Sequence, residues 1–104
     1  MPTWHRLGSR DELAARTPFA LKLDRQQIAV FLHEGRFRAI GNRCNHKGGP
    51  LCEGQVRGEF VMCPWHAWRF RLCDGAWLDN LKGAIRTPSY EVRVEGDEIQ
   101  VRIP

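Results

Sequence analysis

Short runs of alternating apolar and polar residues make up most of the chain, and turn-forming residues separate them at regular intervals. Such alternation is typical of strands, because successive side chains in a strand point to opposite faces of the sheet. Short strands at this spacing indicate an antiparallel, all-β fold. The predicted strands cover residues 4–7, 19–23, 27–32, 36–40, 59–62, 68–72, 89–94 and 99–103.

A short helix interrupts this pattern near the N-terminus. Ser9 is a good N-cap, because its hydroxyl can accept a hydrogen bond from the first turn, and acidic residues follow at Asp11 and Glu12. The Thr17-Pro18 step then ends the helix. One or two helical turns are therefore expected after Ser9.

Turns and core positions follow from the same pattern. Residues 54–58 are interpreted as a turn, and Asp74-Gly75 is a strong hairpin signal. Tyr90, Val92 and Val94 alternate with Glu91 and Arg93 and are expected to share one face. The predicted core consists of Leu7, Ile28, Val30, Phe37, Ile40, Val61, Phe70, Val92, Val94, Ile99 and Val101.

The composition is that of an ordinary globular domain. The chain has 104 residues, of which 42% are hydrophobic, and this is enough for one domain with its own core. We find no linker, so residues 1–104 are expected to form a single domain. The N-terminus has no apolar signal segment and no run is long enough to span a membrane, which favours a cytoplasmic protein.

The charge balance is mildly basic, with 16 Lys and Arg against 12 Asp and Glu and a formal net charge of +4. These basic residues are scattered and form no block or aromatic-interleaved groove, so nucleic-acid binding is not predicted. Most are interpreted as solvated strand faces. An acidic protein partner is the functional alternative.

Two Cys-His pairs carry the candidate chemistry: Cys44-Asn45-His46 and Cys63-Pro64-Trp65-His66. Two thiolates and two imidazoles suit a [2Fe-2S] cluster in which two His replace two Cys on one iron. Zinc also accepts two Cys and two His, although usually at other spacings. Four Cys could instead form two disulfides. Cys52 and Cys73 lack a neighbouring His and are interpreted as packed thiols.

These two motifs resemble the Rieske iron–sulfur family, in which C-x-H-x-G and C-P-x-H carry the ligands. The first matches Cys44 to Gly48, the second matches Cys63 to His66, and the likeness extends over about residues 40–103. The resemblance implies an antiparallel Rieske-type β sandwich with a small cluster-binding subdomain of two loops, at about residues 41–73.

The resemblance also implies the roles of single residues. One iron would be held by Cys44 and Cys63, and the other by His46 and His66. Gly48 would let backbone amides approach the bridging sulfides. Two interpretations of Lys47 stay open: it steers a partner or is merely exposed. Trp65 is a lid, a docking contact or core, and Trp68 packs beside the site.

Several departures from the family pattern predict a low reduction potential. In the respiratory and photosynthetic branch of the family, a disulfide clamps the two loops at the positions that hold Gly49 and Trp65 here. That branch also has hydroxyl donors at the positions that hold Trp68 and Phe70 here. Fewer donors to the cluster stabilise the added electron less. Ala67 stands where the family usually has Gly, and residues 81–86 match its third loop poorly.

The resemblance therefore implies a low-potential one-electron carrier, a Rieske-type ferredoxin that passes electrons from a flavoprotein reductase to an oxygenase. It would be a monomeric electron-transfer component rather than an enzyme. A catalytic oxygenase needs a second iron on two His and a carboxylate, and only His5 and His33 remain for it. The small Rieske subunit of an assimilatory nitrite reductase is the alternative, although its cluster ligands are often incomplete.

Overall fold

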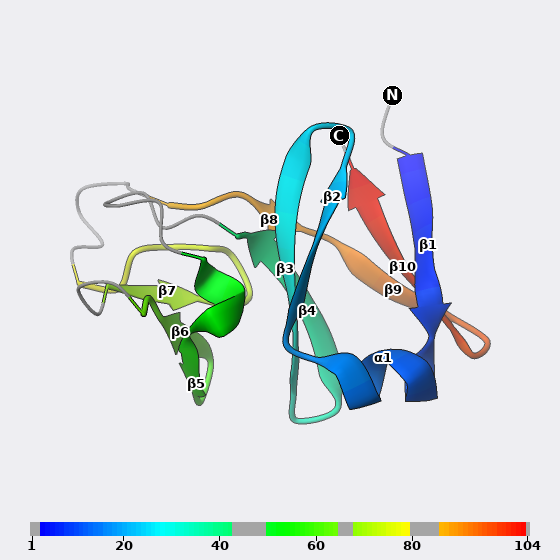
Figure 1. Cartoon of the computed structure of the whole chain (residues 1–104), viewed down its shortest axis with the longest axis horizontal. Helices are drawn as coiled ribbons and strands as arrows, with labels where there is room; N and C mark the ends of the chain where they lie inside the picture. The colour runs from blue at the N-terminus through cyan, green and yellow to red at the C-terminus, as the bar shows by residue number, and fades with distance from the viewer. Residues whose placement is uncertain (1–2, 43–49, 65–67, 80–85, 104) are drawn as a thin grey trace.

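A computed structural model describes residues 3–42, 50–64, 68–79 and 86–103. These residues form three antiparallel sheets, which follow one another along the long axis of the molecule (Figure 1). The first sheet has the order β1 (Thr3–Ser9), β10 (Glu98–Ile103), β9 (Val92–Glu95). The second has the order β2 (Phe19–Leu23), β3 (Gln26–His33), β4 (Arg36–Gly41), β8 (Ser89–Tyr90). The small sheet consists of β5 (Gln55–Arg57), β6 (Phe60–Met62) and β7 (Arg69–Arg71).

Strand β3 lies in the middle of this arrangement and is buried on both faces. Ile28 and Val30 point to one face and Ala29 and Phe31 to the other, and each is at most 1% exposed. This follows from the period of two in a strand, because an unbroken apolar run must place residues on both sides. Strand β3 therefore contributes to two separate cores.

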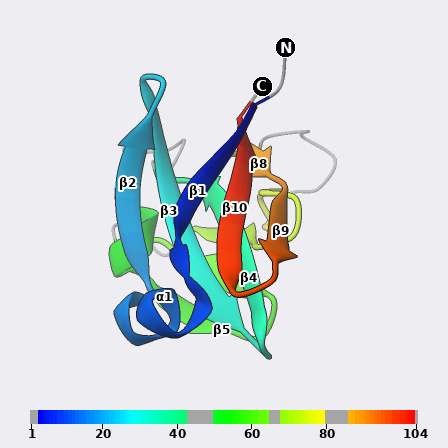
Figure 2. The ribbon, with the colours of Figure 1, turned by 90° about the vertical axis from the view of Figure 1, so that its right-hand side faces the viewer.

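The sandwich core lies between the first and second sheets, and Figure 2 looks onto the first sheet with β3 behind it. The site core lies between the second sheet and the small sheet. The sandwich core consists of Leu13, Ile28, Val30, Phe37, Ala39, Ile99, Val101 and Ile103. The site core consists of Ala29, Phe31, Ile40, Leu51, Val61, Cys63, Phe70 and Leu72.

Helix α1 (Arg10–Arg16) confirms the N-cap prediction. The Ser9 hydroxyl accepts a hydrogen bond of 3.3 Å from the Glu12 amide, and Leu13 is fully buried in the sandwich core. Among the described residues, the other helical element is the 3-10 turn η1 (Leu51–Glu53), which contacts β3 and β2. In the part of the chain that the structure describes, the helices are too short to cross a membrane.

One turn prediction and one strand prediction are wrong. Residues 55–57 form β5 rather than a turn, and β5 pairs with β6 from Gln55 opposite Met62 to Arg57 opposite Phe60. Only Val56 of β5 packs against the site core, so the sequence holds too little alternation to reveal a strand. The predicted strand 89–94 is divided at Glu91, where the chain crosses from the second sheet to the first.

The burial prediction fails at Val94, whose side chain is 48% exposed. Val94 is opposite the buried Ile99, but it lies near the end of β9, the edge strand of its sheet. Tyr90 and Val92 do pack against the sandwich core, as expected, and so does Leu7. Alternation in the sequence assigns a face to a residue, whereas the extent of the opposite layer decides whether that face is covered.

Buried Thr87 joins three segments that are distant in the sequence. The Thr87 amide donates to the Gly75 carbonyl at 2.9 Å. The Gly41 amide donates at 2.8 Å to the carbonyl of Pro88, the residue that follows Thr87. A side chain at Gly41 would overlap the Thr87 hydroxyl, and one at Gly75 would overlap the Thr87 carbonyl. The close approach of the three segments therefore depends on these two glycines.

Replacing Gly75 with Ala is expected to destabilise the protein more than replacing Gly58 with Ala. Both residues have positive φ angles, of 73° and 58°, but only Gly75 has backbone within contact distance of an added Cβ. Backbone strain alone costs about 1–2 kcal/mol, and Gly75→Ala must in addition displace Thr87. Denaturant unfolding of the two variants, followed by far-ultraviolet circular dichroism, measures the difference. An equal loss would contradict this account.

Candidate metal centre

The structure describes two of the predicted site residues, Cys63 and Trp68. Predicted ligands and neighbours outside the described residues are Cys44, His46, Lys47, Gly48, Trp65 and His66. Gly49, Ala67 and residues 81–85 lie outside them as well. What the structure does show is how the chain is held on either side of these segments.

Cys63 directly follows strand β6 and is only 2% exposed. Its thiol belongs to the site core together with Leu51 and Phe70. The Cys63 amide donates a short hydrogen bond of 2.6 Å to the carbonyl of Trp68. This bond closes the segment 64–67, which contains His66, at its base.

Asn42 closes the segment 43–49 in a similar way. Its backbone carbonyl accepts from the Leu51 amide at 3.0 Å, and its side-chain carbonyl accepts from the Cys52 amide at 2.8 Å. Asn42 is 9% exposed, and its backbone amide donates to the backbone carbonyl of Gln27 in β3 at 2.9 Å. The ends of the segment with Cys44 and His46 are therefore fixed to the central strand.

The other two described cysteines do not form disulfides. Cys73 is exposed, whereas Cys52 is half-buried beside the site core. Burial raises the pKa of the Cys52 thiol, and the nearby Glu53 carboxylate adds to this effect. Cys52 is thus held as a packed thiol, as predicted, whereas the same prediction is wrong for the exposed Cys73. The two-disulfide interpretation is wrong as well.

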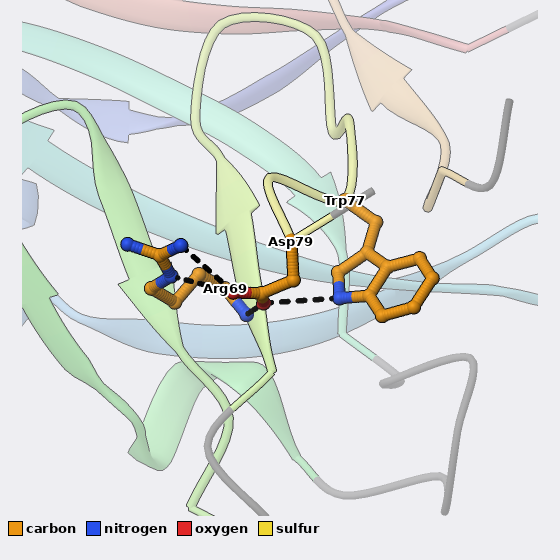
Figure 3. A network of polar contacts seen from close by, with 3 residues as sticks. All are labelled: Arg69, Trp77 and Asp79. Atoms are coloured by element: carbon orange, nitrogen blue, oxygen red, sulfur yellow. Dashed lines mark hydrogen bonds and ion pairs between the residues drawn. The ribbon is translucent and has the colours of Figure 1, made fainter. Parts of the chain in front are cut away.

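Trp68 packs against the site core and stacks on Trp77, with ring centroids 3.9 Å apart and planes inclined by 13°. The indole Nε1 of Trp77 donates to Asp79 at 3.1 Å, and Asp79 also binds Arg69 (Figure 3). Sequence reasoning identified Trp68 as a packing residue but gave no role to Trp77, Arg69 or Asp79. Only the repeated aromatic residues after the second motif hinted at this arrangement.

Asp79 accepts four hydrogen bonds. Oδ1 accepts from Nε and Nη2 of Arg69 at 3.0 and 2.7 Å, and Oδ2 accepts from the Arg69 amide at 3.2 Å and from Trp77. Partial burial opposes ionisation of this carboxyl group, but the Arg69 and Trp77 donors outweigh it and lower the pKa of Asp79. Asp79 is therefore a carboxylate at neutral pH.

A separate group of metal-ligating side chains lies where β3 and β6 meet their turns. In the described part of the chain, His33, Glu34 and Glu59 are the one such group, with ligand atoms within 4.8 Å of one another. His33 Nε2 is 3.6 Å from Glu59 and 3.7 Å from Glu34, so a protonated His33 forms ion pairs with both. With a single His, this group is not the two-His, one-carboxylate set of a mononuclear iron oxygenase.

The chain belongs to the Rieske family, because the model of the Rieske [2Fe-2S] domain matches residues 3–91. Membership in this family implies a [2Fe-2S] cluster and makes the chain a Rieske electron-transfer domain. The described part of the site fits such a cluster. A buried cysteine follows strand β6, it belongs to an apolar core against which Trp68 and Trp77 pack, and its backbone amide is already bonded.

Solved structures of two small proteins match over almost their whole length. The ferredoxin of carbazole 1,9a-dioxygenase from Nocardioides aromaticivorans IC177 has a TM-score of 0.82 and 31% identity, covering 95% of this chain and 96% of that one. A Mycobacterium tuberculosis protein described as an NADH-dependent nitrite reductase small subunit has a TM-score of 0.84 and 28% identity, covering 100% and 97%.

Curated relatives are much longer. Human apoptosis-inducing factor 3 is 34% identical over 76 residues, which make up 73% of this chain but only 12% of that protein. The chain thus spans about an eighth of this relative. The likeness covers the Rieske domain and carries no information on the remainder of that protein.

Proposed function

We propose that this chain is a low-potential one-electron carrier, a Rieske-type ferredoxin that takes electrons from a flavoprotein reductase and passes them to a terminal oxygenase. The observation that carries this proposal is the full-length match to a dioxygenase ferredoxin, which covers 95% of one chain and 96% of the other. In this role the protein is a cytoplasmic, monomeric component and does not itself transform the substrate.

The proposed ligands are Cys44 and Cys63 for one iron and His46 and His66 for the other. Their support is the pair of motifs, together with the hydrogen bonds of Asn42 and Cys63 that close both segments. When bound, the cluster supplies the site that takes up and releases one electron. Lys47, Gly48, Trp65 and Trp68 are proposed as its neighbours.

The small subunit of a nitrite reductase is the second candidate. The match to the M. tuberculosis protein described in this way covers the whole of this chain. The four residues of the Rieske ligand motifs are all present here, which favours an electron carrier over a subunit with an incomplete site.

A reconstituted assay is expected to separate the two functions. With NADH, a flavoprotein ferredoxin reductase and a Rieske ring-hydroxylating oxygenase, the cluster-loaded protein should increase product formation at least about tenfold over the mixture without it. A parallel pull-down with a nitrite reductase large subunit is the comparison. A stable complex with that subunit, and no effect on the oxygenase, would favour the second candidate.

Replacing His66 with Cys or Ala should abolish the Rieske-type electron paramagnetic resonance signal of the dithionite-reduced protein. The imidazole ligands give the cluster its Rieske character, and a lost or exchanged ligand removes it. Cys52→Ser and Cys73→Ser are matched controls and should keep the signal, because neither thiol is among the proposed ligands. An unchanged signal in the His66 variants would refute the ligand set.

The midpoint potential is expected near about −150 mV, the low end of the Rieske range. Phe70 is fully buried in the site core and, like Trp68, has no hydroxyl to donate to a sulfur atom. A spectroelectrochemical titration at neutral pH measures the midpoint. Phe70→Tyr, which restores a hydroxyl, should raise it. A wild-type midpoint near about +300 mV would contradict the low-potential proposal.

A further inference from the structure

A continuous series of contacts connects Asp79 to the segment that carries His66. Asp79 holds the indole N–H of Trp77, and the Trp77 ring lies flat on the Trp68 ring (Figure 3 shows the Asp79 contacts). The Trp68 carbonyl in turn accepts the 2.6 Å hydrogen bond from the Cys63 amide. The last of these contacts closes the base of segment 64–67.

Asp79 can hold Trp77 in place because the Asp79 carboxylate is itself held by several hydrogen bonds. Three of its four hydrogen bonds come from Arg69, two from the guanidinium group and one from the amide. The hydrogen bond from the Arg69 backbone amide ties the carboxylate to β7, directly after Trp68 in the sequence. Both guanidinium donors meet the same oxygen, Oδ1, and the backbone amide meets Oδ2, so each carboxylate oxygen is held by Arg69. The fourth bond then holds the indole N–H of Trp77, whose ring is stacked on Trp68.

We propose that Asp79 is a positioning residue for the cluster: by holding Trp77 against Trp68, it fixes the closing end of the segment between Cys63 and Trp68. This inference rests on the proposed function, because it takes Cys63 and His66 to be ligands. It adds that Asp79, which is neither a proposed ligand nor a proposed neighbour of the cluster, determines how the second ligand pair is held. A supporting group of this kind sets ligand orientation and tunes the metal.

The chain contains a matched control on the same strand. Arg71 also lies in β7 and donates from Nε and Nη2 to Asp74, at 3.0 and 2.6 Å. Asp74 also accepts from a backbone amide, that of Ala76, at 3.0 Å. Both are Arg–Asp pairs of similar partial exposure. The Arg71 guanidinium donates to both oxygens of Asp74, whereas that of Arg69 donates to one oxygen of Asp79, and the described contacts of Asp74 include no indole group.

The test compares Asp79→Ala and Asp74→Ala in the full, cluster-loaded chain. Asp79→Ala should weaken the near-ultraviolet circular dichroism of the tryptophan stack and shift the g values of the reduced cluster. It should also release iron to a chelator about tenfold faster, which corresponds to about 1.4 kcal/mol. Asp74→Ala should leave both spectra unchanged. Asp79→Asn should lie between the wild type and Asp79→Ala in these measurements, because its amide oxygen can still accept a hydrogen bond.

Equal release rates and unchanged spectra in the two alanine variants would overturn the proposal. Should Asp79→Ala fail to fold, Trp77→Phe takes its place, because this variant keeps an aromatic ring, although a smaller one, and removes the Nε1 donor. Unaltered g values in Trp77→Phe would then overturn it. A wild-type protein without a Rieske-type signal would instead refute the proposed function, so the two failures are distinguishable.

Discussion

The fold depends on one strand that is buried on both faces. In β3, Ile28 and Val30 complete the sandwich core, while Ala29 and Phe31 complete the site core. Complete burial of a large apolar side chain contributes about 1.5–3 kcal/mol, so this strand serves as the common wall of both cores. Its register is also fixed, since a shift of one residue would exchange the two faces. The sheet that stabilises the sandwich therefore also carries the small sheet of the candidate site.

Hydrogen bonds at the base of the site hold the described ends of the two segments that contain the proposed ligands. Asn42 is bonded to β3 on one side and to Leu51 and Cys52 on the other. Cys63 and Trp68 are bonded to each other across the second segment. Buried groups of this kind must be paired, because an unsatisfied amide costs about 1–3 kcal/mol. The scaffold thus fixes where each segment with proposed ligands begins and ends.

Much of the fold was predictable because the information is local. Alternation located most strands, and the Ser9 cap with its acidic first turn located α1. The failures have physical causes as well. Residues 55–57 carry one inward apolar side chain, the break at Glu91 depends on which sheet each half can reach, and Val94 is exposed at the end of an edge strand. Each of these is decided by a partner strand that is distant in the sequence.

By itself the sequence determined the family of the chain, because Cys-x-His and Cys-Pro-x-His are short local motifs that carry the proposed ligands. It also determined the apolar character of β3, on which both cores depend. Only the tertiary structure decided how the site is supported. Asp79 is ten residues from Arg69 and meets it through the fold of the chain, and Thr87 meets Gly41 and Gly75 across two sheets. Such pairings depend on where strands pack, and no local pattern encodes them.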